Sequence, residues 1–131
     1  MNSVTGMVRR LLRAEGFAVL VASLFLYHRL EASWLRFFLL FLVPDLSFAG
    51  YLRGTRVGAY VYDAAHSYVL PIALGLIGIM LDSSRFPELA MIWTGHIGFD
   101  RLLGYGLKYP SSFRETHLGL IGREIPSPSV P

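Results

Sequence analysis

Apolar segments long enough to cross a lipid bilayer make up most of this chain. The longest runs from Val57 to Leu81, and a membrane-spanning helix needs only about 20 predominantly apolar residues. Of the 131 residues, 53% are hydrophobic and 16% are charged. Charged residues make up about a quarter of a typical soluble domain. These values predict an integral membrane protein.

Short polar turns divide the apolar segments into four predicted transmembrane helices, at about 10–27, 33–52, 57–81 and 86–107. Pro44 lies inside the second helix, where its missing N–H is expected to produce a kink. Pro87 is well placed for the first turn of the fourth helix. The expected fold is therefore an all-α integral membrane four-helix bundle. It forms one domain over residues 1–123, followed by a short, flexible Pro/Ser-rich tail at 124–131.

The distribution of basic residues predicts the orientation of the bundle. If the N-terminus is cytoplasmic, nine of the 12 Lys and Arg residues lie on the cytoplasmic side, and only Arg29, Arg36 and Arg85 lie on the other. This imbalance follows the positive-inside rule and places both termini in the cytoplasm. The expected location is a cell membrane, in contact with its lipids. The arginines are scattered around the apolar segments, so no nucleic-acid partner is expected.

Every predicted helix carries at least one carboxylate in its cytoplasmic half. With a rise of about 1.5 Å per residue, His66 and His96 lie at nearly the same depth on neighbouring helices. Ionisable groups inside a membrane are costly, and by default they indicate a functional site. The residues of this layer are Glu15, Asp45, Asp63, His66, His96 and Asp100.

The spacing of these residues indicates a metal site. Asp63 and His66 are three residues apart and His96 and Asp100 are four apart, so each pair lies on a single helical face. Soluble di-metal bundles combine single carboxylates with carboxylate and histidine pairs in a similar way. The chain has no cysteine, which excludes thiolate ligands. The expected cofactor is a divalent ion, either zinc, iron or manganese, with all six residues of the layer as candidate ligands.

Structural interpretations of the same residues remain open. The two histidines could form hydrogen bonds between helices, and Asp45 could cap a helix broken at Pro44. The other carboxylates could form ion pairs near the membrane surface: Asp100 with Arg101 or Arg56, and Glu15 with Arg13 or Arg53.

The chain resembles a family of small, mostly bacterial membrane proteins that is catalogued only as a domain of unknown function. The resemblance extends from about Leu12 to Arg123 and implies four helices in a bacterial cytoplasmic membrane, with no activity attached. It implies that Asp45, His66, His96, Asp100 and His117 belong to the site. The motifs that carry the resemblance are Pro44-Asp45-Leu46-Ser47, Gly50-Tyr51, Ala65-His66-Ser67-Tyr68 with Pro71, His96-Ile97-Gly98-Phe99-Asp100-Arg101, Gly104-Tyr105-Gly106-Leu107-Lys108-Tyr109-Pro110 and Thr116-His117-Leu118-Gly119.

We expect a metal-dependent intramembrane enzyme, with hydrolysis of a lipid or other apolar substrate from the cytoplasmic half of the bilayer favoured over di-iron oxidation. Asp45 would act as ligand or general base, and His117 is the second candidate catalytic residue. One alternative is a haem protein that uses His66 and His96 as axial ligands. Another is an ion-coupled transporter or structural protein that forms a homo-oligomer.

Overall fold

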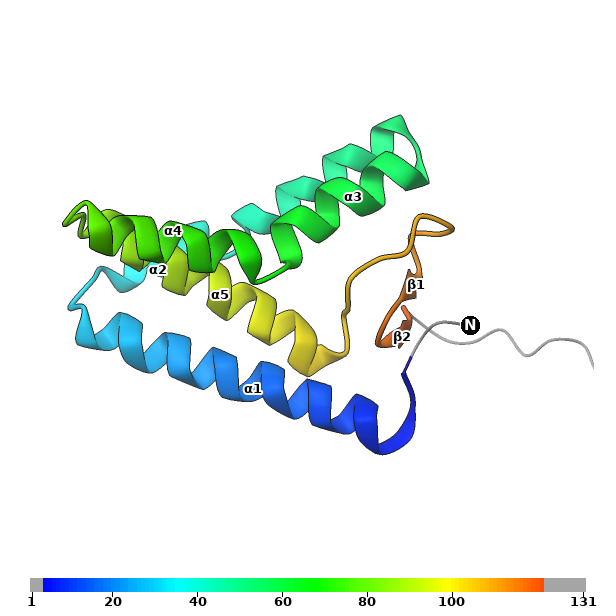
Figure 1. The fold of residues 1–131 in the computed structure, drawn as a ribbon, viewed down its shortest axis with the longest axis horizontal. Helices are drawn as coiled ribbons and strands as arrows, with labels where there is room; N and C mark the ends of the chain where they lie inside the picture. Colours follow the sequence, from blue (N-terminus) through cyan, green and yellow to red (C-terminus); the bar gives the residue numbers. More distant parts are fainter. Residues whose placement is uncertain (1–3, 122–131) are drawn as a thin grey trace, which may run out of the picture.

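The computed structural model describes residues 4–121, which form a helical bundle with one small hairpin (Figure 1). The all-α class is thereby confirmed. The predicted tail at 124–131 lies outside the described residues. In chain order the elements are α1 (Gly6–Arg29), α2 (Trp34–Leu40), the 3-10 helix η1 (Val43–Arg53), α3 (Thr55–His66), α4 (Val69–Met80), α5 (Arg85–Leu103), β1 (Glu115–Thr116) and β2 (Gly119–Leu120).

Three helical stretches are long and apolar enough to cross a membrane: Gly6–Arg29, Trp34–Arg53 and Thr55–Met80. Their outer faces are strongly apolar, with Leu39, Leu46 and Met80 each at least 70% exposed. An apolar surface of this extent is unfavourable in water and suits a lipid environment. The three stretches support the prediction of a membrane protein. Helix α5 is not among them, so the fourth spanning helix and the cytoplasmic termini stay predictions.

The second apolar segment changes helix type at Pro44. The α-helix ends at Leu40 and the chain continues as η1, with Pro44 in its first turn. Proline fits there because the first N–H groups of a helix have no partner within it. The N–H of Asp45 donates to the carbonyl oxygen of Leu42 at 3.0 Å. The kink expected in a single helix over 33–52 is therefore a change from α-helix to 3-10 helix, with Asp45 in its first turn.

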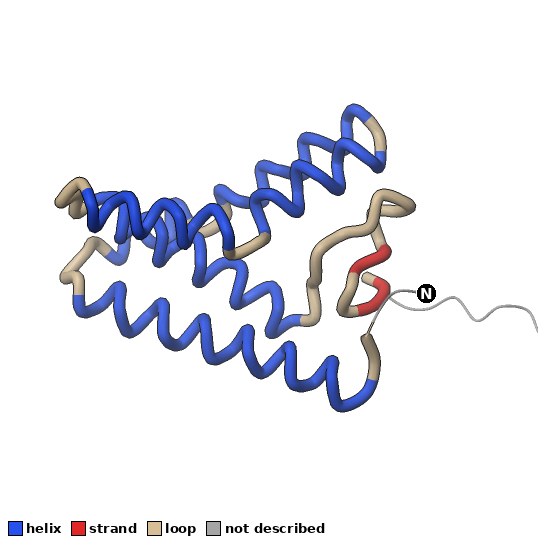
Figure 2. The backbone as a smooth tube through the Cα atoms, in the orientation of Figure 1, coloured by secondary structure: helices blue, strands red, loops and turns tan. Residues whose placement is uncertain are grey.

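The third apolar segment, expected as one helix over 57–81, is divided into α3 and α4. Ser67 adopts an extended conformation between them, with φ −94° and ψ 152°. Pro71, in the first turn of α4, has no N–H to bond the carbonyl group four residues earlier, so the ladder of hydrogen bonds cannot continue through this point. As a consequence His66 is the last residue of α3. Figure 2 shows the bend between α3 and α4 that follows it.

Helix α5 ends four residues earlier than expected, at Leu103. Gly104 takes a left-handed conformation with φ 92°, and the N–H of Tyr105 donates to the carbonyl oxygen of Asp100 at 2.8 Å. Glycine tolerates this conformation, which commonly ends helices. The chain then folds back as a hairpin over the ends of the helices, where the N–H of Val4 donates to the carbonyl oxygen of His117 at 2.9 Å.

Candidate metal centre

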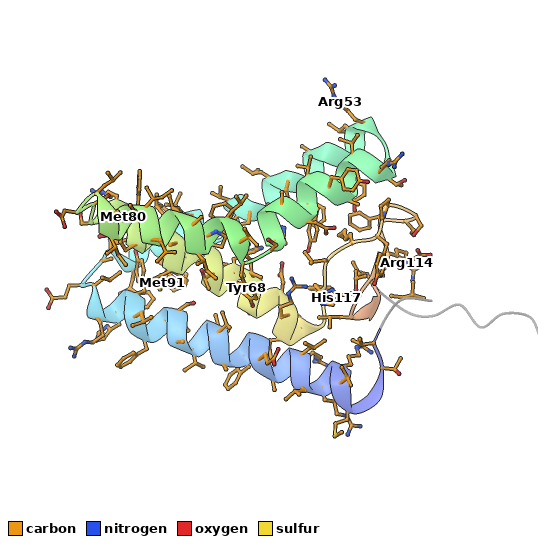
Figure 3. The ribbon with its side chains drawn as sticks, viewed as in Figure 1. Arg53, Tyr68, Met80, Met91, Arg114 and His117 are labelled. Carbon is orange, nitrogen blue, oxygen red and sulfur yellow. The ribbon has the colours of Figure 1, made fainter. Side chains whose placement is uncertain are left out.

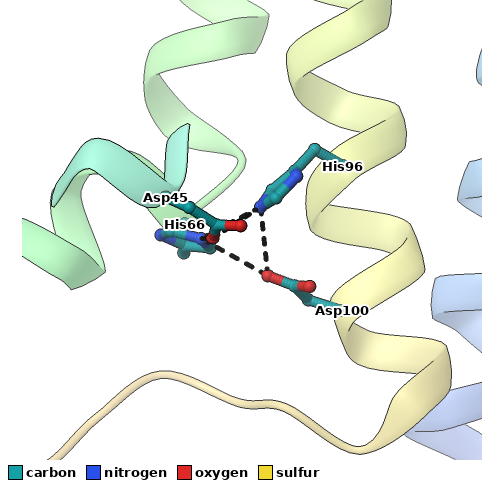
Figure 4. A group of neighbouring side chains, drawn as sticks. All are labelled: Asp45, His66, His96 and Asp100. Carbon is teal, nitrogen blue, oxygen red and sulfur yellow. Dashed lines mark hydrogen bonds and ion pairs between the residues drawn. The ribbon is translucent and has the colours of Figure 1, made fainter. Parts of the chain in front are cut away.

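Four of the predicted ligands come together at the centre of the bundle: Asp45, His66, His96 and Asp100. One ligand atom of each lies within 4.8 Å of those of the other three. Asp45 comes from η1 and His66 from the end of α3, while His96 and Asp100 lie one turn apart on α5 (Figure 4). The breaks at Pro44 and before Pro71 therefore set the positions of two of these side chains.

Five of the six distances between the four ligand atoms are short and nearly equal. Nε2 of His66 lies 3.3 Å from Oδ1 of Asp45 and 3.3 Å from Oδ2 of Asp100. Nε2 of His96 lies 3.2 Å from each of the same two oxygen atoms. The two Nε2 atoms are 3.2 Å apart. All four atoms thus surround a single point.

The hydrogen bonds of His66 determine which of its nitrogen atoms faces the cluster with a lone pair. Nδ1 of His66 lies 3.0 Å from the carbonyl oxygen of Tyr62, an acceptor that requires a proton on Nδ1. In the neutral ring Nε2 is then unprotonated and directs its lone pair at the cluster, as in a metal-bound histidine. Nδ1 of His96 is buried without a hydrogen bond of standard geometry to the described residues, and the Phe41 carbonyl lies beside that ring.

The four side chains differ in their exposed fraction. The side chains of His66 and His96 are 3% and 2% exposed, and that of Asp100 is 15% exposed. The side chain of Asp45 is 36% exposed. Both histidines and Asp100 are thus held inside the bundle, while Asp45 forms the open side of the cluster.

Neighbouring side chains hold His66 in place. The Tyr62 ring stacks on its imidazole with a centroid distance of 3.8 Å and an interplanar angle of 10°. Two side chains of α5 donate to carbonyl oxygens left free at the end of α3: Nε1 of Trp93 to Ala65 at 2.6 Å, and Nη2 of Arg101 to His66 at 3.1 Å. Sequence reasoning missed this support, although a helix that ends before Pro71 must leave carbonyl groups in need of donors.

The other three predicted site residues lie outside the cluster. Glu15 is exposed on α1. Oδ1 of Asp63 accepts a hydrogen bond from the backbone N–H of Lys108 at 2.6 Å. Nδ1 of His117 accepts one from the N–H of Leu107 at 2.9 Å, which fixes this ring in the hairpin region.

A buried lysine that the sequence analysis did not identify lies beside the open side of the cluster. Lys108 is 3% exposed, and its Nζ lies 3.4 Å from the ring centroid of Phe113 and 4.8 Å from that of Tyr62. Nζ also donates to the carbonyl oxygen of Phe113 at 2.8 Å. A cavity of about 240 Å³ is lined by Lys108 together with Asp45 and Asp100. The Lys108 ammonium group and the two carboxylates of the cluster therefore line the same cavity.

We expect Lys108 to make the stability of the fold depend on pH. Burial lowers the pKa of its ammonium group from 10.5 to about 8, partly offset by the charge of Asp63. Between these two values the unfolded chain binds more protons than the folded one, so stability should rise with pH from about 8 to 10.5. Unfolding midpoints in detergent should show this rise in the wild type, and Lys108→Met should lack it. Parallel curves for the two proteins would contradict this assignment.

The fold and the cluster define a helical membrane protein with a buried histidine and aspartate centre that could hold a metal ion. The chain belongs to the family described as a domain of unknown function (DUF4260), whose model matches residues 9–121. The predicted family membership is thereby confirmed. No curated protein and no solved structure matches the chain.

Proposed function

We propose that Asp45, His66, His96 and Asp100 bind one divalent metal ion and that the protein is a metal-dependent hydrolase of lipids or other apolar substrates. The observation that carries this proposal is the convergence of two carboxylate oxygens and two imidazole nitrogens on one point. Such an arrangement of acceptor atoms inside a bundle is unfavourable unless protons or a metal ion supply positive charge.

Five of the six distances between the ligand atoms suit a small ion such as zinc. They are 3.2 to 3.3 Å, and a regular tetrahedron with edges of this length has its centre about 2.0 Å from each corner. The sixth distance, between the two carboxylate oxygens, is no longer than 4.8 Å. Zinc binds histidine nitrogen at about 2.0–2.1 Å and carboxylate oxygen at about 2.0–2.2 Å. Iron and manganese accept the same ligand types and remain candidates.

The geometry does not favour the haem alternative. Two axial nitrogen atoms on opposite sides of one iron must be about 4 Å apart, which is twice a metal–nitrogen bond of about 2.0 Å. Nε2 of His66 and Nε2 of His96 are 3.2 Å apart, and two carboxylates occupy the space around them.

A hydrolase needs a metal position that water or substrate can reach, because catalytic zinc sites keep one position open. Asp45 is the ligand best placed to provide it, since its side chain is the most exposed of the four. Its carboxylate would accept a proton from the attacking water and return it to the departing alcohol. The ion held by His66, His96 and Asp100 would polarise the ester carbonyl group.

An apolar cavity beside the cluster suits the acyl chain of a lipid. It has a volume of about 380 Å³ and is lined by Pro44, Ala65 and Trp93, among other residues. Pro44 and Ala65 directly precede Asp45 and His66, and Trp93 lies one turn before His96. A chain in this cavity would place its polar end near the metal. In the predicted orientation the substrate would come from the cytoplasmic half of the bilayer.

The test of this proposal is Asp45→Asn in the purified, untagged protein. We expect the wild type to contain about one equivalent of metal and to hydrolyse acyl esters, tested with fluorogenic esters of increasing chain length and with phospholipids. Asp45→Asn should retain most of the metal, because the amide keeps an oxygen donor at the exposed position and the three more buried ligands are unchanged. It should lose activity by about 100-fold or more, the usual range for a general base. Stoichiometric metal without turnover of any ester would reject hydrolysis and keep the metal site.

A further inference from the structure

We propose that the protein has a second site, a phosphate-binding cavity lined by Arg101, His117 and Tyr68. The cavity has a volume of about 500 Å³, and its opposite wall is formed by α1 around Gly16. None of these residues belongs to the metal cluster. Figure 3 shows Tyr68 and His117 near the C-terminal end of α5, where Arg101 lies. The inference does not depend on the proposed hydrolase.

Arg101 provides the strongest indication of an anionic ligand. The residue is 9% exposed, and its Nη2 donates to the His66 carbonyl oxygen. Nη1 is buried and forms no hydrogen bond of standard geometry with the part of the chain that the structure describes. Among residues 4–121 no carboxylate forms an ion pair with this guanidinium, because the neighbouring Asp100 faces the two histidines. A buried guanidinium without a charged partner is costly, so an oxyanion bound here would lower that cost.

Two further donors face the same cavity. Nδ1 of His117 accepts the Leu107 N–H, so the proton of the neutral ring is on Nε2. Burial and the nearby Arg101 guanidinium lower the pKa of His117, which keeps the ring in this neutral form near pH 7. The hydroxyl oxygen of Tyr68 accepts a hydrogen bond from the Arg101 guanidinium, so the hydroxyl proton can be donated to a ligand. A guanidinium group with two neutral donors suits phosphate, whose oxygen atoms match the planar fork of arginine.

The surrounding charge also favours an anion. Arg9 and Arg13 lie beside Gly104 at the same end of the bundle, and Nε of Arg13 donates to the Leu102 carbonyl oxygen at 2.8 Å. Among the described residues, Glu15 is the one acidic residue that lines the cavity, and it is exposed on α1. The basic end of a membrane helix lies near the lipid headgroups. The phosphate could therefore belong to a lipid headgroup or to a soluble phosphate ester.

The first experiment measures binding of inorganic phosphate to the full-length protein in a phosphate-free maltoside detergent, by calorimetry, before and after EDTA treatment. We expect saturable binding of about one equivalent that persists without metal. Arg101→Gln should weaken it by at least about 10-fold, the effect of a lost charge-assisted hydrogen bond. His117→Asn keeps an acceptor for the Leu107 N–H but removes the Nε2 donor, and should weaken binding by about 3- to 10-fold.

Further variants separate this site from nonspecific attraction. Glu15→Gln should tighten phosphate binding because it removes a negative charge from the cavity wall. Arg29→Gln, at the other end of α1, should leave it unchanged. Displacement of phosphate by short-chain phosphatidylglycerol would identify a lipid headgroup as the ligand, and its absence would indicate a soluble phosphate ester. The proposal is rejected if folded protein binds neither ligand, if binding disappears with EDTA, or if His117→Asn and Glu15→Gln leave the affinity unchanged.

Discussion

Replacing His96 with alanine is expected to abolish metal binding. The variant removes one of the two buried nitrogen ligands, so only two carboxylates and one imidazole remain to bind the metal. Mutation of a residue that only forms a hydrogen bond to a metal ligand typically weakens metal affinity by about 10- to 100-fold. The loss of the ligand itself should therefore weaken metal affinity by at least about 100-fold. Elemental analysis of protein purified in detergent, together with zinc titration of the EDTA-treated protein, measures this loss.

Two matched variants distinguish a metal site from a network of hydrogen bonds. His28→Ala removes an exposed histidine at the end of α1 and should retain the metal. Asp100→Asn preserves the size of the side chain and much of its hydrogen bonding but removes the charge, so it should also lose the metal. If the wild-type protein binds no divalent ion and these variants change only its stability, the cluster is a polar network and the hydrolase proposal fails with it.

The sequence predicted the apolar segments and a kink at Pro44, but it did not predict the change of helix type there or the division of the third segment into two helices. Hydropathy reports the length of a segment, and a proline within it is compatible with a kinked helix or with two helices. Whether a kinked helix or two separate helices result depends on whether neighbouring side chains can form hydrogen bonds with the freed backbone groups. For the segment 57–81 those neighbours are Trp93 and Arg101 of α5, which bond the end of α3. The hairpin was missed because its strands have only two residues each.

The residues of the cluster were predicted only in part. Depth and helical spacing placed six residues in one layer, and four of them come together: Asp45, His66, His96 and Asp100. Depth does not determine which way a helix is rotated about its axis: Gly16 faces α5, which turns its neighbour Glu15 outward. Asp63 shares a face with His66, but its carboxylate accepts the Lys108 N–H instead. That contact depends on the course of the chain after α5, for which helical periodicity holds no information.

Gly98→Ala is expected to destabilise the protein, because the backbones of α1 and α5 are in close contact at this residue. A Cβ atom added at Gly98 would lie 2.8 Å from the carbonyl oxygen of Gly16 and 2.9 Å from the backbone nitrogen of Leu20. Both are backbone atoms of a helix and cannot move aside separately, so the two helices must separate. Overpacking of this kind typically costs about 1–3 kcal/mol. Because α5 also carries His96 and Asp100, the same shift should weaken metal binding.

Gly95→Ala is the matched control on the same helix, one turn earlier. Its added Cβ would meet nothing closer than the Cβ of Ser23 at 3.5 Å, which is ordinary contact. Alanine favours a helix over glycine by up to about 1 kcal/mol, so this variant should be neutral or stabilising. The free energy of unfolding of both variants is measured in mixed micelles by tryptophan fluorescence. Opposite effects on stability would confirm that backbone contact between α1 and α5 fixes the position of the two α5 ligands. Equal effects on stability would mean that the two helices are farther apart.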